Sequence, residues 1–272
     1  SLEQFHATSA ATALATRLAA KIKTATPALS MLSVRGMMVH SAKWTPEMIR
    51  IGNIKDIIPL CGYGVPDEET ALFSNEKYAT FIFENELIPY WEKDGSNTYN
   101  QLHFYDLPWP TEVLEQMGEE NVKIRITLSY YVKPSPGYAG RSNKYRYPSA
   151  TLHFDLKSAS ESMEEFLCRR NKSEGEKKTD NDTNRWTIKQ QRREQGTVQS
   201  DWIECTAAEL ASCGQIIVYP GQGWWKERKL ANVDNVIKYS LIVSIETTKT
   251  EIYDAVETAI SNRIGVQIMQ EV

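Results

Sequence analysis

The sequence predicts an α+β protein in which a short helical part is followed by an antiparallel β-sandwich. Up to about residue 75 the apolar residues recur at helical spacing, and beyond it they fall in short β-rich runs with polar alternation. Of the 272 residues, 41% are hydrophobic and 24% are charged, as in ordinary soluble globular proteins. We therefore expect two domains, at residues 1–75 and 76–272.

The helical part opens with an alanine-rich segment over residues 8–25. Its large apolar residues recur at every fourth position, which places them on one face of a helix. They are Leu14, Leu18 and Ile22. The segment is therefore expected to form an amphipathic helix, with Thr8 or Ser9 as its N-cap and Pro27 beyond its end.

Further helical features are expected before residue 75. A second helix is predicted over residues 28–42, and a short one at Thr45–Met48, where Thr suits the cap and Pro the first helical position. The stretch "CGYGVPDEETAL" predicts a Gly/Pro turn followed by one helical turn. These helices are too few, and too apolar on one face only, to form a hydrophobic core of their own. We expect them to pack against the β-rich part, against a segment outside this chain, or against both.

The β-rich part contains six runs of strand length separated by turn residues. In "VKIRITLSYY", at residues 122–131, apolar and polar residues alternate, which predicts a strand with one buried face. The other five runs lie at residues 78–90, 100–110, 149–157, 214–226 and 237–248. Residues 265–272 are a candidate closing strand. Many short strands in series favour an antiparallel β-sandwich.

A charged insertion interrupts this series around residues 157–200 and carries few apolar residues. A short helix is expected at residues 159–170 and a mobile loop at residues 171–184. The insertion is thus predicted to lie outside the core.

Composition excludes several classes of function. The formal net charge of -4 argues against a nucleic-acid partner, and no apolar run is long enough to span a membrane. The four cysteines are scattered, without zinc-ligand spacing, so we expect no metal, no cofactor and a cytoplasmic location. They are Cys61, Cys168, Cys205 and Cys213. The N-terminus does not have the pattern of a signal peptide. Because the chain lacks an initiator Met and begins with Ser-Leu-Glu-Gln, it is expected to be a fragment or a processed product.

Ser9 is the candidate catalytic residue. A serine at a helix N-terminus lies where backbone N–H groups converge and where the helix dipole is positive. This position suits a helix cap, and it also suits a nucleophile beside a developing oxyanion. The position alone leaves both alternatives open.

Three segments resemble the subtilisin-like serine peptidases, the subtilase family. "ATSAATALATRLAAKI" resembles the segment of their nucleophile, in which Thr-Ser opens a helix of small residues. "VRGMMVHSAKW" resembles their second helix, and "GYGVPDEETAL" resembles the turn that closes their catalytic domain. The family has Gly before Thr-Ser where this chain has Ala7. The resemblance implies that residues 1–75 are the helical remnant of a subtilisin-type α/β catalytic domain.

The resemblance also implies the chemistry. Ser9 would be the nucleophile of peptide-bond hydrolysis, and its partners would be an Asp, a His and an oxyanion-hole Asn that precede the serine in the family. His6 is too close in sequence to be that histidine, and His40, His103 and His153 follow the serine. They are expected to be structural or surface residues. This chain alone is therefore expected to be inactive.

The expected partners are a peptide or protein substrate and the missing N-terminal catalytic segment. The β-rich part resembles the C-terminal domain of bacterial subtilases encoded beside an AAA-type ATPase, which makes such an ATPase a candidate partner. The alternative is a non-catalytic β-sandwich that binds a partner or positions substrate, with Ser9 only as a cap. Aromatic residues near turns could serve such binding, or could instead plug the sandwich. They are Tyr105, Trp109, Trp224 and Trp225.

Overall fold

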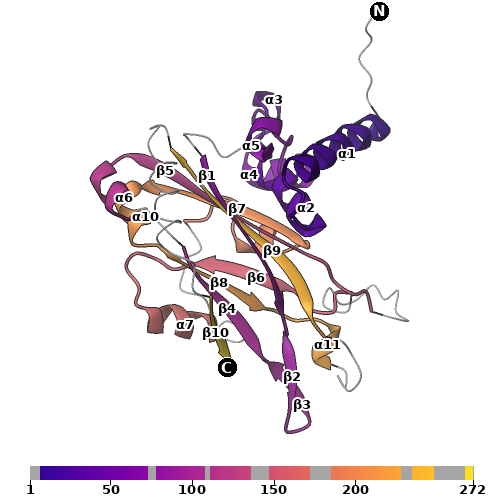
Figure 1. Cartoon of the computed structure of the whole chain (residues 1–272), viewed down its shortest axis with the longest axis vertical. Coiled ribbons are helices and arrows are strands. Elements are labelled where there is room, and N and C mark those ends of the chain that lie inside the picture. Colours follow the sequence, from indigo (N-terminus) through magenta and orange to yellow (C-terminus); the bar gives the residue numbers. More distant parts are fainter. Residues whose placement is uncertain are drawn as a thin grey trace, which may run out of the picture.

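The computed structural model has helices at its N-terminal end and two four-stranded antiparallel sheets (Figure 1). The ranges it describes are residues 7–72, 78–107, 111–135, 147–171, 185–227, 235–247 and 267–271. The expected α+β class is confirmed, with the helical part first along the chain.

Within residues 7–72, five helices precede the first described strand. They are α1 (Thr8–Ala25), α2 (Met31–His40), α3 (Pro46–Ile49), α4 (Ile54–Cys61) and α5 (Glu68–Leu72). The expected start of α3 is confirmed, because the Thr45 side chain accepts a hydrogen bond from the Met48 N–H and Pro46 holds the first position. Helix α4 was not expected from the sequence, and it contains Pro59, a residue that usually ends a helix.

The expected cap of α1 is wrong. The N-cap is Ala7, whose extended backbone places its carbonyl to accept from the N–H groups of Ala10 and Ala11, and no side chain caps the helix. The helix therefore begins with Thr8, and Ser9 is its second residue. The reason is that Ala7 is the last extended residue, so Thr8, the first of the two expected cap residues, is already helical.

The first sheet has the strand order β1-β9-β5-β7, and all its neighbours are antiparallel. Its strands are β1 (Tyr78–Leu87), β9 (Ile237–Thr247), β5 (Asn121–Tyr130) and β7 (Val198–Thr206). The second sheet has the order β10-β4-β8-β6. Its strands are β10 (Gln267–Glu271), β4 (Gln101–Asp106), β8 (Gln215–Pro220) and β6 (Leu152–Leu156). A separate hairpin joins β2 (Tyr90–Lys93) to β3 (Ser96–Tyr99).

The main hydrophobic core contains buried residues of both sheets. Ile124, Ile126 and Leu128 of β5 belong to it together with Leu152 and Phe154 of β6. Short helices close its margins. They are α6 (Thr111–Met117), α10 (Ala207–Ala211) and α11 (Trp224–Glu227).

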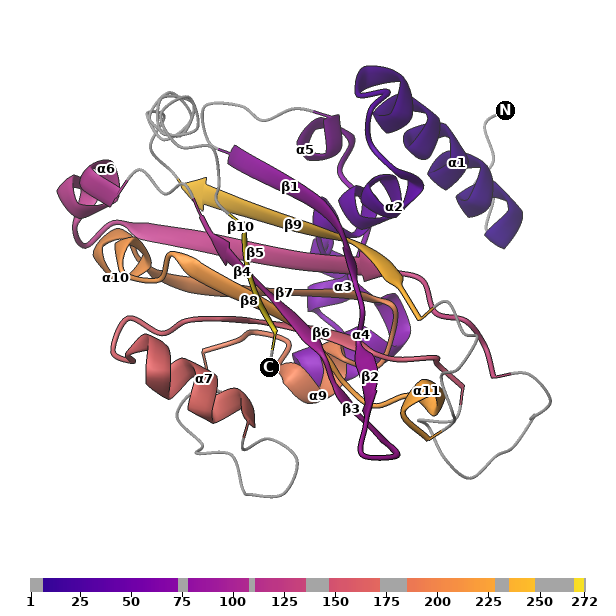
Figure 2. The same ribbon diagram turned by 60° about the horizontal axis from the view of Figure 1, so that its bottom comes forward.

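Strand β5 is buried on both faces, although its alternation predicted only one buried face. The residues of its polar face, Arg125, Thr127 and Ser129, are buried as well. The reason is that α2 lies across β5 and β9 on the outer side of the first sheet (Figure 2). The helical part and the first sheet therefore share a buried contact.

The charged insertion is only partly outside the core. It contains α7 (Met163–Asn171) and α9 (Gln190–Arg193), and β7 begins within it. Trp186 and Ile188 are buried in spite of the charge around them. The predicted helix at residues 159–170 corresponds to α7, and the predicted mobile loop lies almost wholly outside the described residues.

The aromatic residues proposed for binding are mostly internal. Trp225 and Tyr105 are buried in the main core, and Trp224 packs against it while its indole N–H donates to the Lys133 carbonyl. Trp109 lies outside the described residues. Trp225 and Tyr105 are therefore core residues and not part of an exposed binding surface.

Candidate functional site

Ser9 lies in the first turn of α1, at the N-terminal end of the helix. The first hydrogen bonds of the helix run from the N–H groups of Ala10 and Ala11 to the Ala7 carbonyl. The N–H groups of Thr8 and Ser9 precede them and have no acceptor among the described residues, as is usual at a helix start. A hydroxyl therefore lies beside N–H donors that no described residue accepts from, at the positive end of an 18-residue helix.

The Ser9 side chain is exposed, and it makes no hydrogen bond to the other described residues. Neighbouring hydroxyls behave differently, since Thr12 and Thr16 each donate to the carbonyl four residues earlier, at 2.8 Å. The Ser9 hydroxyl is thus engaged neither in capping nor in bonding back to its own helix.

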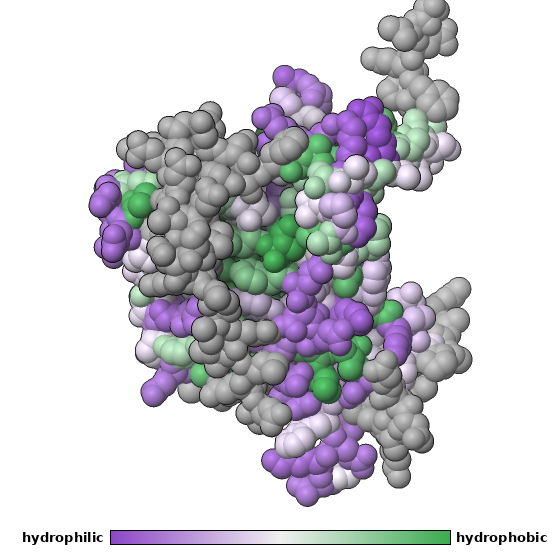
Figure 3. Space-filling model, viewed as in Figure 1, coloured by the Kyte–Doolittle hydropathy of each residue, from purple (hydrophilic) through white to green (hydrophobic). Residues whose placement is uncertain are grey.

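The N-terminal half of α1 projects from the body of the protein (Figures 1 and 2). Leu14 on this half is 64% exposed, although the sequence predicted it on the packed face with Leu18 and Ile22. Figure 3 shows pale green, weakly apolar surface on this projecting end. An apolar, small-residue helix surface is thus without a covering partner among the described residues.

The C-terminal half of α1 is anchored. Leu18 and Ile22 form a small hydrophobic cluster with Val34 and Met37 of α2 and Ile242 of β9. Two ion pairs, from Arg17 and Lys21 to Glu68, add contacts to α5. The helix that carries Ser9 is therefore held at its C-terminal end, and no described residue covers its N-terminal end.

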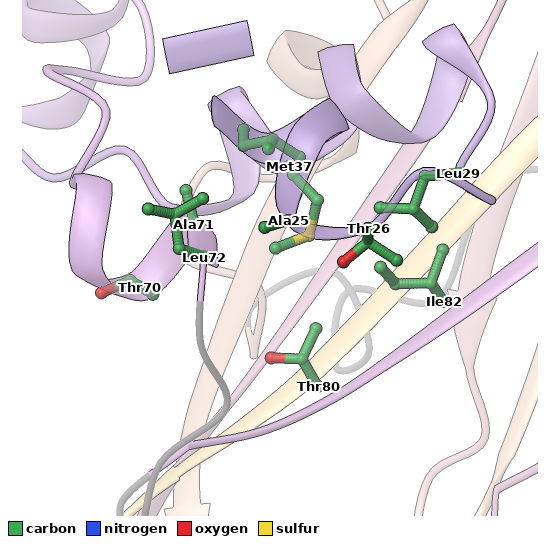
Figure 4. A pocket seen from close by; sticks show the side chains of 10 residues that line it. Ala25, Thr26, Leu29, Met37, Thr70, Ala71, Leu72, Thr80 and Ile82 are labelled. Atoms are coloured by element: carbon green, nitrogen blue, oxygen red, sulfur yellow. The ribbon is translucent and has the colours of Figure 1, made fainter. Parts of the chain in front are cut away.

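A cavity of about 140 Å³ lies at the anchored end, between α1, α2, α5 and β1. Figure 4 shows Thr80 and Ile82 of β1 on one side of it and Ala25 and Met37 on the other. Its lining consists of apolar residues and three threonines, and it carries no acid or base. Because Ala25 is about 24 Å from Ser9 along the helix, at about 1.5 Å per residue, the cavity is no part of a site at Ser9.

None of the three described histidines is bonded to Ser9. His40 is buried, with Nδ1 2.8 Å from Thr127 Oγ1 and Nε2 2.8 Å from Ser244 Oγ. Burial, followed by the nearby Arg125 and Lys123, holds the pKa of His40 well below its usual range. His40 is therefore a neutral structural residue, as expected.

The other histidines also make contacts within the β-rich part. His103 Nδ1 lies 2.6 Å from the Tyr239 hydroxyl, and burial lowers the pKa of His103 to about 4. His153 lies between the Thr151 hydroxyl at 3.2 Å and the Glu194 carboxylate at 3.3 Å. His6 lies outside the described residues.

The described ranges contain no group of three or more His, Cys, Asp or Glu side chains that could hold a metal ion. Cys61, Cys205 and Cys213 are free thiols, and burial raises the pKa of Cys205 to about 12. A thiol with such a pKa is a poor nucleophile at neutral pH. Within the same ranges no helix is both long enough and apolar enough to cross a membrane.

Sequence reasoning missed a layer of polar contacts between α2 and the first sheet. Glu84 of β1 and Arg125 of β5 both bind α2, and Arg35 of α2 donates to Ser129 and to backbone carbonyls of the sheet. One signal was present in the sequence, since Arg125 and Ser129 lie on the polar face of a strand otherwise typical of a core. Only the position of α2 shows that this face is covered.

Comparison with known proteins gives one match, which covers the helical part. Residues 1–79 match the model of the subtilase family of peptidases (peptidase S8). No curated protein and no solved structure matches the chain. The similarity therefore includes Ser9, α1 to α5 and the first residues of β1, while the rest of the β-rich part has no matching relative.

Proposed function

We propose, on the premise that residues 1–79 match the subtilase family, that this chain is the C-terminal part of a subtilisin-like serine endopeptidase. Ser9 is its nucleophile. The observation that carries the proposal concerns the Ser9 hydroxyl. It is exposed at a helix N-terminus, beside N–H groups that have no acceptor among the described residues, and it is not used as a cap.

The reaction is acyl transfer. Ser9 Oγ attacks the carbonyl carbon of the scissile peptide bond while its proton passes to a histidine upstream of this chain. The negative oxygen that forms accepts a hydrogen bond from the Ser9 N–H. The C–N bond then breaks, the leaving amine takes the proton from the histidine, and water hydrolyses the ester on Ser9.

The uncovered half of α1 supports the same proposal. In a complete catalytic domain, further structure would pack on this half and cover Leu14, which is 64% exposed here. The alanines around it allow the close approach of such a partner. The missing N-terminal catalytic segment is therefore the proposed partner of this surface.

The chain alone is proposed to be incompetent. Neither a histidine nor a carboxylate is bonded to Ser9 within the described ranges, so nothing there removes the hydroxyl proton. Loss of the triad partners of a serine nucleophile costs several orders of magnitude in rate.

The test compares the complete protein, the 272-residue chain and their Ser9→Ala variants on a fluorogenic peptide. We expect the complete protein to cleave the peptide, Ser9→Ala to lower kcat at least a thousandfold, and the 272-residue chain to be inactive. Thr16→Ala, a matched hydroxyl deletion on the same helix, should retain activity. Full activity of Ser9→Ala in the complete protein would contradict the assignment of Ser9 as the nucleophile. Turnover by the short chain that depends on Ser9 would contradict its incompetence.

A second candidate function concerns the β-rich part, which is proposed to bind a protein partner or position substrate. The hairpin of β2 and β3 exposes Trp91, with Lys93 5.8 Å from the centre of its ring. An AAA-type ATPase is one proposed partner, from the resemblance. Trp91→Ala should weaken co-purification with such an ATPase without changing the unfolding midpoint, and unchanged co-purification would exclude this surface.

A further inference from the structure

Helix α2 is held against the first sheet by charged side chains at both of its ends. The helix lies across β5 and β9, and the two charges come from different strands. Glu84 of β1 reaches its N-terminal end, and Arg125 of β5 reaches its C-terminal end. Each charge is opposite in sign to the end of the helix dipole that it meets.

At the N-terminal end, the Glu84 carboxylate binds the first turn of α2. The Ser30 N–H donates to Glu84 Oε1 at 2.7 Å, and the Ser33 hydroxyl donates to the same oxygen. Burial alone would raise the pKa of Glu84, but these hydrogen bonds outweigh it and lower the pKa. Glu84 is therefore a carboxylate at neutral pH. The Ser33 hydroxyl also lies 2.7 Å from Ser240 Oγ of β9, which ties the same turn to a second strand.

At the C-terminal end, the Arg125 guanidinium binds two backbone carbonyl groups, one in the last turn of α2 and one just beyond the helix. Its Nη1 donates to the Ala42 carbonyl at 2.7 Å, and its Nη2 donates to the Val39 carbonyl at 3.1 Å. Its Nε donates to Ser200 Oγ at 3.1 Å. Each of the three guanidinium nitrogens thus donates a hydrogen bond, and Nη1 and Nη2 donate to carbonyls at the C-terminal end of α2.

Arg125 is 7% exposed, yet it forms no ion pair in the part of the chain that the structure describes. Burial lowers its pKa to about 10, so it remains a cation at neutral pH. A buried cation needs compensation, and the hydrogen-bonded groups around Arg125 are carbonyls and a hydroxyl. The carbonyl end of α2 is therefore a specific partner of this charge.

The position of α2 determines the position of α1. Only a short turn joins the two helices, and Lys23 of α1 donates to the Pro27 carbonyl in it at 2.7 Å. Leu18 and Ile22 of α1 pack on Val34 of α2 in one cluster. A displacement of α2 on the sheet would therefore displace α1 and the residues at its start.

We propose that Glu84 and Arg125 are positioning residues for Ser9, acting through α2 and α1. The first sheet is then a functional part of the peptidase, because it sets where the nucleophile helix stands. This inference rests on the proposed function, and it assigns residues of the β-rich part, beyond the matched segment, to the action of Ser9.

The first test measures amide hydrogen exchange in the 272-residue chain and needs no activity. Arg125→Met should raise exchange rates in α1 and α2 at least tenfold while the β5–β9 pairing keeps its protection. Lys123→Met is the matched control, since Lys123 is two residues away on the same face and its ion pair, at 3.3 Å, is with Glu246 of β9. Equal exchange of α1 in the two variants would overturn the proposal.

The second test measures kcat and KM in the complete protein. Arg125→Met and Glu84→Gln should each lower kcat at least tenfold and change KM less than twofold, since they misplace the nucleophile and leave the substrate contacts intact. Arg125→Lys, which keeps the charge, should restore part of kcat. Glu86→Gln is the control on β1, because Glu86 pairs with Lys238 of β9 at 2.9 Å.

The results separate the two proposals. A complete protein that is inactive in every form, with the exchange difference present, would contradict the proposed function. An active protein in which Arg125→Met and Lys123→Met have the same kcat would contradict the positioning role while leaving the nucleophile in place. A loss confined to KM would also contradict it.

Discussion

Gly36 of α2 lies directly against Ile242 of β9. A β-carbon at position 36 would stand 2.6 Å from Ile242 Cδ1 and 3.3 Å from the β-carbon of Ser129. The first distance is shorter than any real carbon contact, and Ile242 is fully buried. Glycine at this position therefore allows the helix backbone to approach the sheet, which brings the ends of α2 within reach of Glu84 and Arg125.

Gly36→Ala should destabilise the protein, although alanine is the better helix former. We expect a loss of about 1–3 kcal/mol in the free energy of unfolding, because the added methyl group overpacks a closed contact. Urea denaturation measures it. Adding Ile242→Val, which removes the clashing Cδ1, should recover part of the loss. Gly196→Ala is the control, since its nearest neighbour would be 3.7 Å away; an equal loss there would contradict the packing argument.

Ser9→Ala should leave the stability of the chain unchanged within about 0.5 kcal/mol, because this hydroxyl caps nothing. Thr206→Ala gives the contrast, since Thr206 caps α10 by accepting from the Glu209 N–H at 3.2 Å. That variant should lose about 1 kcal/mol. Thermal and urea unfolding of the two variants measure the two changes in stability. A loss for Ser9→Ala as large as that for Thr206→Ala would show that Ser9 is a cap after all.

Stability should fall with acid below about pH 6.5, the pKa of an unperturbed histidine. His40 is neutral in the fold, where its pKa is well below the usual range, while an unfolded chain binds the proton readily. The unfolded state then holds more protons, so stability is lost as pH falls. His103, with a pKa of about 4, acts in the same direction between about pH 6.5 and 4.

Urea midpoints at pH 7.5, 6.5 and 5.5 test this dependence. His40→Gln should be less stable at pH 7.5 but should show a shallower decline with acid, by up to about 1.4 kcal/mol per pH unit. The groups that face His40 are the hydroxyls of Thr127 and Ser244 and the cations Arg125 and Lys123. Parallel profiles for the two proteins would rule out His40 as the cause.

Arg193→Met should be strongly destabilising. Arg193 and Asp201 are 2% and 0% exposed and approach to 3.5 Å, and Asp201 also accepts from the Ile188 N–H at 2.7 Å. Removing the cation leaves a buried carboxylate without its ion-pair partner, at a cost of about 3–5 kcal/mol. Lys238→Met is the control, because the pair of Lys238 with Glu86 is exposed and should be worth less than about 1 kcal/mol. Similar unfolding free energies for both variants would contradict the burial argument.

Prediction from the sequence succeeded for elements that can be identified from a local pattern of residues. The alternation in "VKIRITLSYY" predicted β5, and Thr45-Pro46 predicted the start of α3. It failed where burial depends on a distant partner. Strand β7 was missed because Gln199 and Asp201 look like surface residues. In the fold both are buried, and their side chains bond to the backbone of Leu152 and Ile188, which belong to other segments.

The candidate site divides in the same way. Ser9 was proposed as the nucleophile from its local motif, and that assignment stays a prediction, while the structural role of His40 was expected from its place after the serine. The cap was wrong by one residue, because the backbone angles of Ala7, and not the identity of the hydroxyl residues, decide where α1 begins.

By itself, the sequence determined the helical part, most of the strands and the identity of the candidate nucleophile, because these depend on residues close together in the chain. Only the tertiary structure decided that α2 lies on the first sheet, that Arg125 binds its carbonyl end and that one half of α1 has no cover among the described residues. Those facts depend on the packing of segments more than eighty residues apart, such as Ala42 and Arg125, and no local pattern specifies such a contact.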